Sequence, residues 1–213
     1  MKKLILKNKI IKKTTNYYEN NLNKFGNNFK GMNWSSKKSQ YLRFSELIKI
    51  GNLNKKSIQD IGCGNGEFVN FLNNKRINFS NYIGTDISAE MINIAKKNFI
   101  SQKKAKFKNH NIITDRLIIS DYVVSSGIFN VRMSYQNKQW EDYVFSIISR
   151  MFDSSKIAIG FNLLTFDVDY KQKNLFYVSI DKIVSFLRNK VGKKIIINHS
   201  YDLWEYTVFV YKK

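Results

Sequence analysis

The alternation of strand-like and helix-like segments after residue 56 constrains the fold of this chain most. Short runs rich in β-branched and aromatic residues alternate with segments whose apolar residues recur at the helical period. Strands are expected at 57–61, 81–85, 105–108, 121–125, 156–162, 193–198 and 205–211. Helices are expected from 67, after Ser88, at 140–151 and at 179–190. Strands separated by helices predict a doubly wound parallel α/β sheet, and the last two strands predict an antiparallel hairpin at one edge.

The first 56 residues follow a different pattern. Residues 1–13 are expected to form a solvated basic arm, and residues 14–25 a helix that ends at Gly26. A second helix is expected at 36–50, because its apolar residues share one helical face. We therefore divide the chain into a basic arm with a short helical cap, 1–56, and a sheet domain, 57–213.

Composition restricts the class of protein. With 43% hydrophobic and 15% aromatic residues, the chain of 213 residues is not globally disordered. It has no apolar run near the roughly 18–20 residues of a membrane span, and its start lacks the apolar stretch of about 7–15 residues of a signal peptide. The single cysteine, Cys63, excludes an internal disulfide and a cysteine-based zinc cluster. We expect a cytoplasmic protein without a membrane partner and without a metal site.

The net charge is large and uneven. Thirty-six basic against 16 acidic residues give +20, of which the first 56 residues contribute +12. Such a charge attracts phosphates and other anions, so nucleic acid is one candidate partner. The chain also lacks proline and is rich in Lys, Asn, Ile, Phe and Tyr, which AT-rich codons encode. Codon bias therefore accounts for much of the lysine excess, and both interpretations stay open.

A glycine-rich turn follows the first expected strand. Asp60 ends the strand, glycines follow at 62, 64 and 66, and a helix begins directly afterwards. Glycines let the backbone turn sharply and approach a ligand, and a helix N-terminus offers free N–H groups. Asp86 ends the next strand, where a carboxylate can accept hydrogen bonds from a ribose diol. The G-x-G-x-G spacing differs from the G-x-G-x-x-G of dinucleotide folds, and no G-K-[ST] phosphate loop is present.

Two segments resemble the first two motifs of the class I S-adenosylmethionine-dependent methyltransferases. They are Asp60-Ile61-Gly62-Cys63-Gly64-Asn65-Gly66 and Tyr82-Ile83-Gly84-Thr85-Asp86-Ile87-Ser88. The resemblance implies a Rossmann-like sheet of seven strands with an antiparallel final strand, and S-adenosyl-L-methionine as the cofactor. It implies that Asp60 and the turn with Gly62, Cys63, Gly64 and Gly66 hold the methionine part.

The same resemblance gives roles to residues further along the chain. Asp86 would bind the ribose, Ile87 and Met91 would pack on the adenine, and Asn111 with Ile112 would lie near the adenine amino group. Ser126 follows the fourth strand, where the active site of the family opens. Arg43 is a candidate for binding the cofactor carboxylate. Tyr17, Tyr18 and Trp34 are candidates for a roof over the site.

Three residues after the fourth strand are the candidate catalytic residues: Asn130, Arg132 and Tyr135. Arg132 could clamp a carboxylate or phosphate of the acceptor, or it could pair with Glu141 or Asp142. His110 is interpreted as a structural neighbour of the adenine and His199 as a loop residue. Methyl transfer to an amine needs no general base, whereas an alcohol needs one.

The predicted function is methyl transfer to an oxygen or nitrogen atom of a small metabolite that could be anionic. The chain contains no proline and therefore lacks the Asn/Asp-Pro-Pro-aromatic motif common among enzymes that methylate base amines. Two alternatives remain: an RNA- or ribosome-associated methyltransferase, and a cofactor-binding module without catalysis. The acceptor and the oligomeric state stay open.

Overall fold

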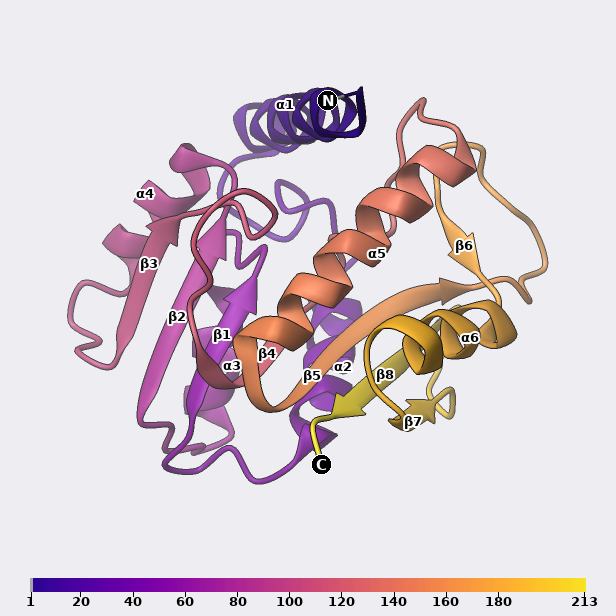
Figure 1. Ribbon diagram of the computed structural model, residues 1–213. Coiled ribbons are helices and arrows are strands. Elements are labelled where there is room, and N and C mark those ends of the chain that lie inside the picture. Colours follow the sequence, from indigo (N-terminus) through magenta and orange to yellow (C-terminus); the bar gives the residue numbers. More distant parts are fainter. Residues whose placement is uncertain (1) are drawn as a thin grey trace.

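The computed structural model describes residues 2–213, with side chains from residue 5 on. The helices are α1 (Lys2–Phe25), α2 (Lys37–Leu47), the 3-10 turn η1 (Ile48–Ile50), α3 (Glu67–Asn74), α4 (Ala89–Asn98), α5 (Asn137–Ser154) and α6 (Ile180–Lys190). The strands are β1 (Ser57–Ile61), β2 (Asn81–Asp86), β3 (Ala105–Asn109), β4 (Ser120–Ser125), β5 (Ser155–Thr165), β6 (Tyr177–Val178), β7 (Lys194–Asn198) and β8 (Glu205–Tyr211). Figure 1 shows their arrangement.

The strands form one sheet in the order β3-β2-β1-β4-β5-β8-β7. The pairs from β3 to β5 are parallel, whereas β8 runs antiparallel to both β5 and β7. This confirms the predicted doubly wound sheet with its antiparallel final strand. The two-residue strand β6 was not predicted, and it pairs with the end of β5 beside the seven-stranded path.

Helices cover both faces of the sheet (Figure 1). On one face α5 and α6 contribute Trp140, Ile148 and Leu187 to a buried cluster. On the other face α2 and α3 contribute Phe44 and Phe68 to a second cluster. Residues 110–119 connect β3 to β4 without a helix. The sheet therefore lacks a covering helix at that connection, next to the carboxyl ends of β2 and β3.

The basic arm expected at residues 1–13 is wrong, because α1 is one continuous helix from Lys2 to Phe25. Ile10 is fully buried in the cluster of α5, and Leu22 packs with Met32 and Met91. Residues 10, 14, 18 and 22 follow each other at four-residue spacing, so they share one helix face. The apolar contacts of this face therefore decide the structure of the segment, although the other faces carry many lysines. Gly26 ends the helix with φ of +77°, as predicted.

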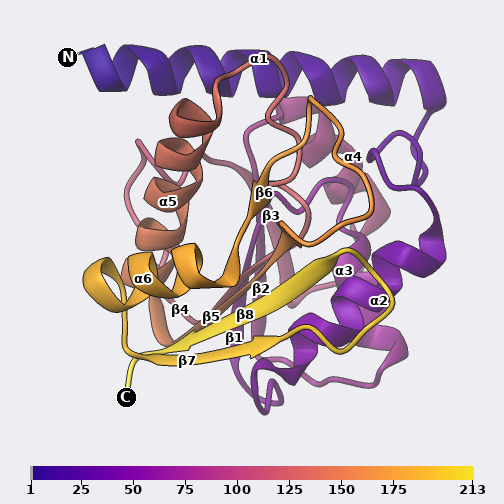
Figure 2. The same cartoon turned by 90° about the vertical axis from the view of Figure 1, so that its right-hand side faces the viewer.

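Helix α1 lies across the carboxyl ends of the parallel strands (Figures 1 and 2). Its first half packs toward α5, and its second half packs toward α4. It is long, but none of the described helices combines the length and the apolar character needed to cross a bilayer. The edge of the sheet at which ligands bind in open α/β folds is therefore covered by the N-terminal helix.

Candidate active site

A cavity lies at the carboxyl ends of β1, β2 and β4, beneath α1. Ten of the residues predicted to bind the cofactor line it: Asp60, Gly62, Cys63, Gly64, Asp86, Ile87, Met91, Asn111, Ile112 and Ser126. Gly66 and Arg43 do not line the cavity. Residues up to 66 positions apart in the sequence therefore meet at one place, because parallel strands end at the same edge of the sheet.

The glycine turn is held against the end of β2. The amides of Gly62 and Cys63 donate to the carbonyl of Thr85, at 2.7 and 3.0 Å. Gly62 has φ of +74°, and a Cβ there would lie 2.2 Å from Cγ2 of Ile128. Only glycine fits both the backbone and the space at this position. Gly66 is the N-cap of α3, where the turn ends, and it lies outside the cavity.

Asp86 fastens the glycine turn to the start of α4. Its Oδ2 accepts from the amide of Gly64 at 3.0 Å, and its Oδ1 accepts from the amide of Ser88 at 2.9 Å. Burial raises the pKa of Asp86, while these amide hydrogen bonds oppose the shift. Each carboxylate oxygen has a second lone pair, so Asp86 can also accept hydrogen bonds from a ribose.

Asp60 is buried at the end of β1 and accepts a hydrogen bond of 2.6 Å from the hydroxyl of Tyr82. Burial raises the pKa of Asp60 to about 7, the Tyr82 bond lowers it, and the nearby Asp86 raises it further. Burial also raises the pKa of the Cys63 thiol, which favours a packing role.

The charges of the cavity are all acidic. Asp60, Asp86 and Glu67 line it, whereas no Lys or Arg is found among its described lining residues. Glu67 accepts a hydrogen bond of 2.6 Å from the hydroxyl of Tyr41 and forms an ion pair with Lys37. A protein with a net charge of +20 thus encloses a site that favours positive groups.

The roof of the cavity comes from α1 and the segment that follows it. Thr14, Tyr18, Met32 and Trp34 line the cavity. Tyr17 does not; it lies at a separate surface groove with Lys13. The indole of Trp34 lies so close to Gly127 that a Cβ there would approach it to 2.3 Å. Two of the three predicted roof residues therefore cover the site.

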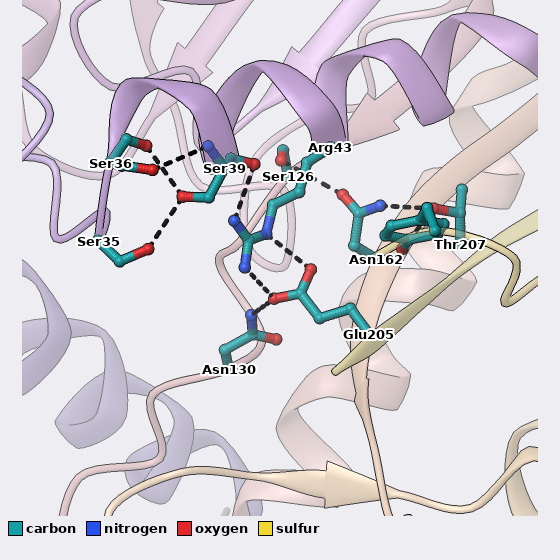
Figure 3. A network of polar contacts seen from close by, with 10 residues as sticks. Ser35, Ser36, Ser39, Arg43, Ser126, Asn130, Asn162, Glu205 and Thr207 are labelled. Carbon is teal, nitrogen blue, oxygen red and sulfur yellow. Dashed lines mark hydrogen bonds and ion pairs between the residues drawn. The ribbon is translucent and has the colours of Figure 1, made fainter. Parts of the chain in front are cut away.

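A buried polar network lies beside the cavity (Figure 3). Arg43 donates to both carboxylate oxygens of Glu205, at 2.7 and 2.6 Å, and its guanidinium packs on the Trp34 ring. Asn130 donates to Oε1 of the same Glu205 at 2.9 Å. Arg43 is therefore committed to Glu205 and supports the roof residue Trp34. The sequence alone did not single out Glu205, because the pair joins residues 162 positions apart.

The three candidate catalytic residues do not line the cavity. The guanidinium of Arg132 donates to the backbone carbonyls of Leu175 and Tyr135, and so pairs with neither Glu141 nor Asp142. The ring of Tyr135 stacks on Trp140. His199 lies beside the Tyr206 ring. The structure therefore gives Arg132 a structural role in holding the loop after β4.

Several residues that sequence reasoning did not assign to the site also line the cavity, among them Thr14, Gln40, Glu67 and Tyr143. The four-residue spacing of 10, 14, 18 and 22 could have revealed the inward face of α1. The side chain of Tyr143 belongs to a helix that the sequence predicted, but its face could not be assigned without the position of α1.

Comparisons with known proteins agree with this geometry. A family profile described as a methyltransferase domain matches residues 59–145. Rv1506c of Mycobacterium tuberculosis, which is named as a methyltransferase, is 30% identical over 159 residues, covering 73% of this chain and 93% of its own length. The residues that match the family profile include the glycine turn and Asp86.

Solved structures share the fold at low identity. The N-methyltransferase NodS of Bradyrhizobium japonicum, solved with S-adenosyl-L-homocysteine, superposes with a TM-score of 0.67 at 12% identity and covers 93% of this chain and 97% of its own. The magnesium protoporphyrin IX methyltransferase of Synechocystis, also solved with S-adenosylhomocysteine, gives 0.60 at 12% identity and covers 83% of each chain.

Proposed function

We propose that this chain methylates an oxygen or nitrogen atom of a small neutral or cationic molecule. The chain belongs to the class I S-adenosylmethionine-dependent methyltransferases. The cofactor is S-adenosylmethionine, whose sulfonium supplies the methyl group when it is bound. The protein then positions the acceptor and excludes water.

The donor set of the cavity fits this cofactor. The backbone of the glycine turn and Asp60 suit the methionine part, because a carboxylate pairs with its ammonium. Asp86 suits the ribose hydroxyls, and Ile87 with Met91 offers apolar contact for the base. The three acids Asp60, Glu67 and Asp86 also suit a ligand that carries a sulfonium charge.

One observation carries the proposal about the acceptor. The cavity has a roof, and the charged side chains among its described lining residues are all acidic. Trp34 and α1 cover the carboxyl edge of the sheet, so a small molecule fits better than a folded polymer. Arg132, the residue considered for clamping an anionic acceptor, is bound to backbone carbonyls. An anionic acceptor would thus meet Asp60 and Asp86, while no Lys or Arg is among the described residues that line the cavity, and this costs free energy.

The lining also favours nitrogen as the acceptor atom. A neutral amine would use its own lone pair to displace the thioether S-adenosylhomocysteine from the methyl carbon, and the methylated ammonium would then release a proton to solvent. This reaction needs no general base. The three residues considered for catalysis lie outside the cavity. An amine acceptor therefore fits the lining best, because it requires no general base there.

Methyl-labelled S-adenosylmethionine tests the proposal on separated acceptor pools. Cell extract is divided into cationic, neutral and anionic small molecules by ion exchange, and total RNA forms a fourth pool. We expect label in the cationic or neutral pool, with Asp86→Ala as the inactive control. Label in the anionic pool or in RNA alone would overturn the acceptor class. Binding of S-adenosylhomocysteine with no label in any pool would favour the inactive cofactor-binding module.

A further inference from the structure

The side-chain amide of Gln40 is buried at the cavity and forms no hydrogen bond with the described residues. Gln40 is only 5% exposed, and it lines the cavity. Its backbone N–H donates to the carbonyl of Ser36 at 3.2 Å in the first turn of α2, so only the side chain lacks a partner. A carboxamide offers one acceptor oxygen and two N–H donors, and buried groups of this kind are nearly always paired. The unused amide therefore indicates a polar ligand in the cavity.

Two neighbours on the same side of α2 give the direction in which Gln40 projects. Arg43 and Phe44 follow Gln40 by three and four residues, so the three side chains share one face of the helix. Arg43 reaches Glu205 at the start of β8 (Figure 3). Phe44 packs on Phe68 of α3, with ring centroids 5.0 Å apart. Helix α3 follows β1, and β8 lies beyond β4 and β5 in the sheet, so Gln40 projects between them, toward the ends of β1 and β4.

The turns of α2 around Gln40 are fixed by contacts of other residues. Ser36 caps the helix with its side chain, and the hydroxyl of Tyr41 donates to Glu67 of α3 at 2.6 Å. The guanidinium of Arg43 is held on the other side by β8. A ligand that binds Gln40 therefore meets a backbone that is already in place, and only the Gln40 side chain has to be ordered.

The cap and the loop after β4 enclose one end of the cavity. A Cβ on Gly127 would approach the Trp34 ring to 2.3 Å, so the two segments touch. Ser126 lines the cavity beside them, and its hydroxyl donates to Oδ1 of Asn162 at 3.3 Å. The contacts proposed for the cofactor lie instead at the glycine turn, at the end of β2 and on α4. The part of the cavity between the cap and β4, toward which Gln40 projects, therefore remains for the acceptor.

We propose that Gln40 binds the acceptor amine, with Oε1 accepting a hydrogen bond from an N–H of that amine. This inference rests on the proposed function and narrows its acceptor class. The contact uses an N–H and leaves the nitrogen lone pair free to attack the methyl carbon. The new C–N bond forms as the C–S bond breaks, and one proton of the methylated ammonium then passes to solvent.

A neutral carboxamide suits this contact better than a further carboxylate would. A carboxylate favours the protonated ammonium, which has no lone pair for the attack. Gln40 accepts from the neutral amine without adding charge to a cavity that three acids already line. Because the contact requires an N–H, the acceptors are primary and secondary amines, and tertiary amines are excluded.

The variant Gln40→Met tests the contact, with Gln172→Met as the matched control, because Gln172 is exposed and lies outside the cavity. Methionine keeps the length of the side chain and removes the amide. Titration calorimetry measures binding of S-adenosylhomocysteine, and label transfer from methyl-labelled S-adenosylmethionine is measured at rising amounts of the cationic or neutral pool that the wild type labels. We expect Gln40→Met to bind S-adenosylhomocysteine within about twofold of the wild type, which also shows that it folds, and to lose at least about fivefold in label at low amounts of the pool.

Unchanged label transfer by Gln40→Met would overturn the contact. A fall in S-adenosylhomocysteine affinity as large as the fall in label would also overturn it, because Gln40 would then bind the cofactor. If the wild type labels neither pool, the proposed function itself fails. A failure of the Gln40 contact alone leaves the label of the wild type in place, so the two failures are distinct.

Chemical blocking of the pool tests the acceptor class. Formaldehyde with cyanoborohydride converts primary and secondary amines to tertiary amines, and cyanoborohydride alone serves as the control treatment. We expect the wild type to label the control pool and to leave the blocked pool unlabelled. Equal label in both pools would overturn the requirement for an N–H and with it the role of Gln40.

Discussion

At the scale of single residues, the acids that line the cavity distinguish this site from the rest of a basic protein. The pKa of Asp60 is raised to about 7, because this carboxyl is buried and lies near the second acid, Asp86. Its pKa of about 7 means that protons and a cationic ligand compete for the same carboxylate. Binding and pH are therefore linked at this residue.

The affinity for S-adenosylhomocysteine should fall as the pH falls from 8 to 6. Asp60 must be ionised to pair with the ligand ammonium, and protonation through its raised pKa removes that form. One pH unit below the pKa, about a tenth of the protein is competent, so the dissociation constant rises about tenfold. Titration calorimetry at several pH values measures this. Asp60→Asn should bind weakly and lose the dependence, whereas a pH-independent wild type would contradict the account.

The buried pair of Arg43 and Glu205 should be important for stability. Their side chains are 11% and 1% exposed, so Glu205→Gln leaves a buried guanidinium without its counter-charge. Such a change costs about 3–5 kcal/mol. Asp142→Asn breaks the ion pair with Lys138, in which the two side chains are 51% and 72% exposed, and should cost less than about 1 kcal/mol. Urea unfolding compares the two, and equal costs would argue against the buried pair.

At the scale of elements, α1 is the part of the fold that the sequence predicted least well. Its lysines suggested a solvated arm for residues 1–13, but Ile10 is buried against α5 and Leu22 lies near α4. Strands and helices after residue 56 were predicted well, because strand runs, the Ser88 cap and the apolar face of α5 are local patterns. The contact of α1 with two distant helices is not local, and charge composition obscured its four-residue spacing.

The substitution Ile10→Ala tests whether α1 is part of the folded core. Ile10 is fully buried, and truncation of such a side chain costs about 2–5 kcal/mol. Ile5, on the same helix, is 50% exposed, so Ile5→Ala should change the free energy of unfolding by less than about 0.5 kcal/mol. Urea unfolding measures both. Equal, small effects would mean that α1 does not dock on the sheet domain in solution.

At the scale of the whole molecule, the Lys and Arg residues that give the chain its positive charge lie outside the cavity, whereas acidic side chains line it. The composition predicted the first property but not the second, because Asp60, Glu67 and Asp86 meet only through the sheet topology. The two cofactor motifs were readable because each is contiguous in the sequence. The candidate catalytic residues were chosen by their position after β4, which did not reveal that backbone carbonyls hold Arg132. Local motifs were therefore predictable, whereas partners across the fold were not.

We expect the cavity beneath α1 to bind the cofactor through Asp86. Calorimetric titration of S-adenosylhomocysteine into the wild type, Asp86→Ala and Asp153→Ala tests it most directly, because Asp153 is an exposed acid outside the cavity. Loss of charge-assisted hydrogen bonds to the ribose should cost about 1.5–3 kcal/mol, a weakening of roughly 10- to 150-fold. Urea unfolding of ligand-free Asp86→Ala checks that the glycine turn survives. We predict tight binding by the wild type and by Asp153→Ala and weak binding by Asp86→Ala. Wild-type binding that Asp86→Ala retains, or no binding by the wild type, would contradict the account.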